Sequence, residues 1–69
     1  MPKYEYAFER VRMEEYPLIG LDTEAFRKVL QAKGQEGWIY SGYLHIRDRG
    51  VKLETEVEVI FRREIPENE

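Results

Sequence analysis

The residues that could carry catalytic chemistry are few. The chain has no cysteine, one histidine (His45) and one serine (Ser41). A serine nucleophile needs a base within hydrogen-bond reach, about 2.6–3.2 Å. Four residues of extended strand separate Ser41 from His45 by about 13 Å, so the two cannot act together within one strand. The sequence therefore predicts that the protein is not an enzyme.

Alternating carboxylates offer a second possible chemistry. Glu54, Glu56 and Glu58 recur at every second residue, which is typical of side chains on one face of a β-strand. Because same-face neighbours lie about 7 Å apart, a cation would have to be held across two strands, for example by Glu54 or Glu56 with His45. A solvated face whose glutamates pair with nearby Lys and Arg explains the pattern without a metal. We predict no metal and no cofactor.

Length and charge limit the remaining function classes. We interpret residues 1–69 as one small domain, with a flexible tail over residues 64–69. The net charge of −3 gives no general attraction to phosphate, which disfavours nucleic acid as a partner. No apolar run approaches the roughly 20 residues that span a bilayer, and no signal sequence follows Met1, so we expect a cytoplasmic protein that does not bind membranes. Charge carried mostly by Glu and Arg hints at a thermophilic source.

The first predicted strand covers residues 3–13. Tyr4, Tyr6 and Phe8 alternate with polar residues, which favours a half-buried strand with these aromatics toward the core. The apolar pattern then changes parity at Val11 and Met13. A bulge near residues 9–10, or a strand end that passes beyond the covering helix, would explain the change.

A connection over residues 14–21 precedes the predicted helix. Its apolar residues indicate that it either folds over one end of the core or contacts another subunit. Asp22 is a good helix N-cap, and Leu21 with Phe26 can form a hydrophobic staple. Gly34 is the expected residue with positive φ after the helix, and Gly37 permits a sharp turn before Trp38.

A hairpin follows the helix, with strands over residues 38–46 and 51–62 and turn residues at 47–50. Loop length fixes which face of its first strand is buried. An odd loop would bury Ile39, Ser41, Tyr43 and His45, whereas an even loop makes a hydrophobic core. The even loop therefore predicts this set on the buried face: Trp38, Tyr40, Gly42, Leu44 and Ile46.

These elements predict an α+β fold in β-α-β-β order. A right-handed crossover gives a three-stranded antiparallel sheet of order 1-3-2, with one helix packed on one face. Tyr4, Tyr6, Trp38 and Tyr40 would lie under the helix, leaving only Tyr43 of the tyrosines on the open face. This placement argues against RNA binding by base stacking.

Three short motifs resemble a family of small bacterial proteins known as domain of unknown function 4177. They are Tyr4-Glu5-Tyr6, the corner Gly34-Gln35-Glu36-Gly37-Trp38, and Phe61-Arg62-Arg63. The resemblance spans nearly the whole chain and implies the same strand-helix-strand-strand plan. It implies no activity.

The uncovered sheet face is the candidate partner surface. Alternating charges suit a symmetric contact between two copies, and the edge of the strand over residues 38–46 offers a second route by extending the sheet. We predict a non-enzymatic interaction module that self-associates as a homodimer through the open face or this edge. The alternative is a nucleic-acid-associated or regulatory protein that uses basic residues on the helix side: Arg10, Arg12, Arg27, Lys28 and Lys33. The residues expected on the partner surface are Ile39, Tyr43, His45, Glu54, Glu56 and Ile60.

Overall fold

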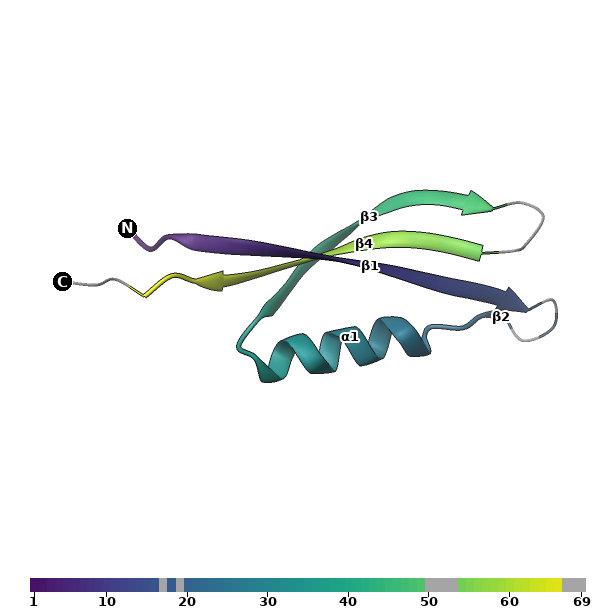
Figure 1. Cartoon of the computed structure of the whole chain (residues 1–69), viewed down its shortest axis with the longest axis horizontal. Helices are drawn as coiled ribbons and strands as arrows, with labels where there is room; N and C mark the ends of the chain where they lie inside the picture. The colour runs from purple at the N-terminus through teal and green to yellow at the C-terminus, as the bar shows by residue number, and fades with distance from the viewer. Residues whose placement is uncertain (17, 19, 50–53, 67–69) are drawn as a thin grey trace.

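The computed structural model describes residues 1–16, 18, 20–49 and 54–66 of the chain. Its strands are β1 (Tyr4–Tyr16), β2 (Gly20–Leu21), β3 (Ile39–Arg49) and β4 (Glu54–Glu64), and its helix is α1 (Glu24–Gln35). The strands form one antiparallel sheet of order β2-β1-β4-β3, and α1 lies on one face of this long, twisted ribbon (Figure 1).

The fold class is confirmed, but the predicted number of strands is wrong. The structure is α+β with one helix against an antiparallel sheet, and the three expected strands keep their order with β4 in the centre. The fourth strand, β2, arises within the segment expected to be a connection. It pairs Glu15 with Leu21 and Tyr16 with Gly20. Gly20 has a φ of 98°, a conformation that glycine adopts without strain.

The sheet extends further at the C-terminus than predicted. β4 includes Glu64, and the amide of Ile65 donates a 2.8 Å hydrogen bond to the carbonyl of Lys3. Glu64, the first residue of the expected tail, therefore lies in β4, and Ile65 follows it with a backbone hydrogen bond to β1's N-terminal neighbour, Lys3. Residues 67–69 and Gly50 of the predicted hairpin turn lie outside the described residues. The rest of that turn, residues 47–49, belongs to β3.

The prediction of which face of β1 packs under the helix is wrong. The β1 ladder with β4 runs without a register shift from Tyr4 opposite Glu64 to Glu14 opposite Glu54, so β1 has no bulge. Val11 lies opposite Val57, and both are buried under the helix. Because side chains alternate along a strand, Val11 and Met13 face α1, and the even-numbered aromatics face away from it. Tyr4, Tyr6 and Phe8 therefore lie on the open face.

Irregularities in β3 also change the predicted faces. Register shifts occur between Tyr40 and Gly42 and between His45 and Arg47. Tyr40 lies opposite Phe61 on the helix side, as predicted. Between the two shifts, odd-numbered residues of β3 point to the helix side and even-numbered residues to the open face, the reverse of the prediction. Tyr43 lies opposite Val59 on the helix side, whereas Leu44, expected in the core, lies opposite Glu58 on the open face.

The corner between α1 and β3 is a Schellman motif. The amide of Gly37 donates to the carbonyl of Gly34, and the amide of Trp38 donates to that of Lys33, both at 3.0 Å. Gly37, with a φ of 90°, is thus the left-handed residue after the helix, whereas Gly34, predicted for this role, lies within α1. At the other end, the N-cap residue is Thr23, and not Asp22 as predicted. The carboxylate of Asp22, one residue earlier, still accepts a 3.1 Å hydrogen bond from the amide of Glu24, which satisfies one free donor of the first turn.

Exchanging these two glycines for alanine should give opposite results. Gly37→Ala is expected to lower the free energy of unfolding by about 1–2 kcal/mol, because an L-residue is strained at positive φ. Gly34→Ala is expected to raise it by about 0.5–1 kcal/mol, because alanine is the better residue inside a helix and open space surrounds this position. Urea unfolding followed by circular dichroism measures both changes. Equal effects would contradict the corner geometry.

The core is thin. The buried hydrophobic side chains in the described residues are Val11, Met13, Val57, Val59 and Phe61. No residue of α1 is fully buried, and the helix packs Phe26, Val29 and Leu30 only partly against this cluster. The chain extends 55 × 20 × 12 Å, with a radius of gyration of 15.0 Å. About 11 Å is typical of a compact domain of this length.

Candidate functional site

The sheet face that points away from α1 carries a group of exposed aromatic and aliphatic side chains. In the centre of this face, Ile60 of β4 lies between Phe8 of β1 and Gly42 of β3. Two residues further along β4, Arg62 lies between Tyr6 of β1 and Ile39 of β3. Tyr6, Phe8, Ile39 and Leu44 are each about half exposed, at 53–55%. We define the open face by these residues: Tyr4, Tyr6, Phe8, Arg10, Arg12, Ile39, Leu44, Glu56, Glu58, Ile60 and Arg62.

Charges of both signs lie beside these apolar residues. Arg10 lies opposite Glu58 and makes a 3.7 Å ion pair with Glu56. The guanidinium of Arg62 lies 5.3 Å from the centre of the Tyr4 ring, a cation–π distance. Arginines and glutamates therefore alternate with aromatic rings, and the open face is not uniformly negative or positive.

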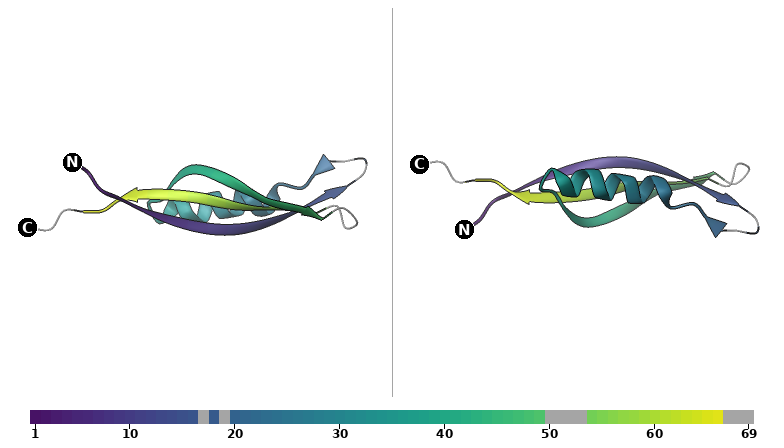
Figure 2. Two further views of the ribbon diagram at one scale, coloured as in Figure 1. Left: turned by 90° about the horizontal axis from the view of Figure 1, so that it is seen from above. Right: turned by 90° about the horizontal axis from the view of Figure 1, so that it is seen from below.

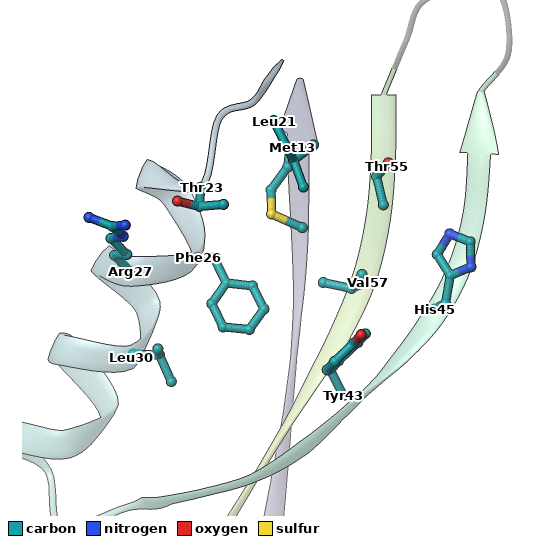
Figure 3. Close-up of a pocket in the computed structure, with 10 residues that line it drawn as sticks. All are labelled: Met13, Leu21, Thr23, Phe26, Arg27, Leu30, Tyr43, His45, Thr55 and Val57. Atoms are coloured by element: carbon teal, nitrogen blue, oxygen red, sulfur yellow. The ribbon is translucent and has the colours of Figure 1, made fainter. Parts of the chain in front are cut away.

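The other face of the sheet forms an apolar groove with α1. The groove has a volume of about 700 Å³, within the range of ligand pockets. Phe26 and Leu30 point from α1 toward the sheet, where Met13 and Val57 face them (Figure 3). The groove also includes residues that contribute polar atoms: Thr23, Arg27, Tyr43, His45 and Thr55. The helix thus covers its face of the sheet incompletely.

The predicted partner-surface residues do not share one face. Ile39, Glu56 and Ile60 lie on the open face, as expected. Tyr43 and His45 are a correction: they line the groove under α1, because the first β3 bulge reverses the parity. The backbone of Glu54 lies opposite that of Glu14 in the β1–β4 ladder, and the side chain of Glu54 is not among those that the structure describes.

The sequence reasoning missed the aromatic row of β1. Tyr4, Tyr6 and Phe8 lie on the open face and were expected in the core. The signal that could have found them is the parity of Val11 and Met13, which match the alternation of the strongly apolar β4. Aligning the apolar parity of the two strands would have turned the aromatics outward.

At the far end of α1, charges surround the tryptophan. The ring of Trp38 lies 5.7 Å from the Lys33 ammonium and 4.2 Å from the Arg63 guanidinium. Arg63 donates a 2.8 Å hydrogen bond to Glu5, and Lys33 makes a 3.4 Å ion pair with Glu9. Trp38 also packs against the core, as predicted. These contacts join β1, β4 and the corner at the C-terminal end of α1.

Among the residues that the structure describes, Tyr16 has a clearly shifted pKa. The Tyr16 hydroxyl donates a 2.9 Å hydrogen bond to the carboxylate of Glu14. This bond, together with the nearby negative charge, stabilises the neutral phenol and raises the pKa of Tyr16 above its ordinary value.

Removing this carboxylate should lower the pKa of Tyr16. Glu14→Gln is expected to return it toward the ordinary tyrosine value, because the charge that opposes ionisation is gone. Glu15→Gln, one residue away, is the matched control and should leave the titration unchanged. Nuclear magnetic resonance of the Tyr16 ring against pH measures both. Unchanged titration in Glu14→Gln would contradict the observed contact.

The two long edges of the sheet differ. In both panels of Figure 2, β1 and β3 form the two borders of the ribbon. The β3 edge carries two register shifts, and such irregularities oppose pairing with a further strand. The β1 edge is regular. Within the described part of the chain, its only strand partner on that side is β2, at Glu15 and Tyr16.

Neither a metal cluster nor a membrane-crossing helix occurs among the described residues. No three of their His, Asp or Glu side chains group so as to hold a metal ion. No helix in this part of the chain has the length and hydrophobicity to cross a bilayer.

Comparisons with models of protein families, with curated proteins and with solved structures give no match. The resemblance to domain of unknown function 4177 therefore stays a prediction.

Proposed function

We propose that this protein is a non-enzymatic interaction module that acts as a homodimer. The observation that carries the proposal is the surface one chain leaves uncovered. The solvent-accessible surface of the single chain is 5608 Å², whereas about 4,600 Å² is typical of a folded monomer of 8.3 kDa. The excess of about 1,000 Å² compares with the roughly 800 Å² that each partner buries in a standard interface.

The charges on the sheet support a second copy as the partner. The open face contains three arginines and two glutamates among its aromatic and aliphatic side chains. In a symmetric contact each patch meets its own copy, so a surface with both signs can complement itself. A strongly basic or acidic partner would match only one sign.

Light scattering after size exclusion tests self-association directly. A dilution series through the micromolar range should give twice the chain mass of 8.3 kDa at high concentration. A mass of one chain throughout the series would contradict the proposal.

Single-stranded nucleic acid is the second candidate, and one observation favours it. The aromatic row of β1 faces solvent, as do the stacking residues of sheet surfaces that bind RNA. The predicted route through basic residues on the helix side is weakened, because Arg10 and Arg12 lie on the open face and Lys33 pairs with Glu9. Anisotropy of a labelled oligonucleotide at low salt, where electrostatic attraction is strongest, would detect this binding. An unchanged anisotropy on addition of the protein would exclude binding of single-stranded nucleic acid.

A further inference from the structure

We propose that two copies stack their open faces on each other, around a two-fold axis that passes over Phe8, Ile60 and Gly42. This inference rests on the proposed homodimer and adds the orientation of the two copies. The axis lies between the two sheets and runs across the strands. It therefore places β4 of one copy over β4 of the other, antiparallel, and β1 over β1.

The two β-ladders arrange the open face in rows that run across the strands. Each row takes one residue from β1, one from β4 and one from β3. Neighbouring rows are about 7 Å apart, because side chains of one face recur at every second residue. The three rows that matter here are, in order along the sheet, Tyr6, Arg62 and Ile39, then Phe8, Ile60 and Gly42, then Arg10, Glu58 and Leu44.

Two charges of opposite sign flank the central row on β4. Among the side chains that the structure describes, Glu58 makes no ion pair, and Arg62 stacks on the Tyr4 ring without pairing with a carboxylate. Four residues of strand hold Glu58 and Arg62 about 13 Å apart, so they cannot pair with each other. A two-fold axis over Ile60, midway between them, brings Arg62 of each copy over Glu58 of the other.

The same axis matches the other residues of the two flanking rows. Ile39 of one copy covers Leu44 of the other, which makes an apolar contact. Tyr6 covers Arg10, which places a guanidinium over an aromatic ring. The central row meets its own copy and carries no charge, so no like charges meet at the axis.

Charge disfavours the neighbouring positions of the axis. An axis over Glu58 would stack Glu58 on Glu58 and Arg10 on Arg10, and an axis over Arg62 would stack arginine on arginine. Like charges in contact oppose association. An axis along β4 would place every residue of that strand on its own copy, with the same result. An axis midway between two rows would cover Ile60 with a charge of the second copy and bury that charge without a partner.

The ordinary geometry of stacked sheets accommodates these contacts. Sheets that pack face to face lie about 10 Å apart, with strand directions within about 30° of each other. In a row 7 Å from the axis, this rotation displaces facing residues by about 3–4 Å, within reach of long side chains such as Arg62 and Glu58. Because α1 packs on the other face of each sheet, both helices lie on the outside of the dimer (Figure 1). The contact covers the aromatic side chains that one chain leaves exposed.

Charge reversal tests this orientation. Arg62→Glu should raise the dissociation constant of the dimer about a hundredfold, because each dimer then contains two like-charge contacts with Glu58. Glu58→Arg should have the same effect. Both changes in one chain should restore a dissociation constant within about tenfold of the wild type, because each contact again pairs opposite charges. Lys28→Glu, on the exposed surface of α1, is the matched control and should leave the dissociation constant unchanged. Analytical ultracentrifugation measures all four.

Cross-linking keeps the test valid if a charge reversal disturbs the fold. The chain contains no cysteine of its own. Ile60→Cys would place two thiols at the axis, whereas Glu64→Cys would hold its two copies about 26 Å apart. A short bismaleimide should therefore join Ile60→Cys at least about tenfold faster than Glu64→Cys, because the dimer raises the effective thiol concentration only at the axis.

The outcomes distinguish this orientation from the homodimer itself. Failure of the double charge exchange to restore association, or equal cross-linking of the two cysteine variants, in a protein whose wild-type mass is dimeric, would overturn the axis over Ile60. The proposed function would then stand. A monomeric wild-type mass would overturn both.

Discussion

Phe61→Ala is expected to unfold the protein at room temperature. Phe61 is 1% exposed and is the largest member of a buried cluster of five side chains. Deleting a buried phenylalanine ring costs about 3–5 kcal/mol. A single core of this size supplies only about 3–5 kcal/mol in total, so little stability would remain. Far-UV circular dichroism and urea titration measure the loss.

Phe8→Ala is the matched control for Phe61→Ala. It removes the same ring from β1, but Phe8 is 55% exposed and lies on the open face. We expect its circular dichroism to stay that of a folded protein, with reduced stability only through weaker association. A loss as large as that of Phe61→Ala would place Phe8 in the core and contradict the observed face.

Phe8→Glu is expected to convert the dimer to monomers. The substitution would place a carboxylate on the open face of each copy, and burying an unpaired charge in the contact between the two copies opposes association. The mass by light scattering should fall to the 8.3 kDa of one chain. The melting temperature of the wild type should rise with protein concentration, because association stabilises the folded state, and this dependence should vanish in the variant.

Tyr43→Glu is the control for that charge. The exposed fraction of Tyr43 is 57%, similar to the 55% of Phe8, but Tyr43 lies on the helix side of β3. The variant should remain a dimer whose melting temperature still depends on concentration. Dissociation of both variants, or of neither, would argue against an interface on the open face.

The elements with one clear apolar face were predictable from the sequence. β4 alternates without interruption through Val57, Val59 and Phe61, and α1 has its apolar residues at helical spacing. Their existence, and the central position of β4, follow from these patterns. The Schellman corner was misplaced by three residues because both Gly34 and Gly37 can follow a helix, and only the hydrogen bonds distinguish them.

β1 could not be assigned in the same way because it carries apolar residues on both faces. Tyr4, Tyr6 and Phe8 have one parity, and Val11 and Met13 have the other. Which face packs under the helix depends on the register with β4, a tertiary property. The bulges in β3 are equally invisible to a two-residue period, so Tyr43 and His45 were placed on the wrong face.

The candidate interface was only partly predictable. A sheet-mediated self-contact, with Ile39 and Ile60 on the open face, follows from an uncovered sheet. The outward orientation of Tyr4, Tyr6 and Phe8 does not, because it depends on the register of β1 with β4. β2 was also not predictable, because it has two residues and no alternating pattern.

The mass of the protein in solution tests the proposed homodimer most directly. Light scattering after size exclusion should give twice the chain mass of 8.3 kDa for the wild type at high concentration, and the mass of one chain for Phe8→Glu. A mass of one chain for the wild type throughout the micromolar range would contradict the proposal.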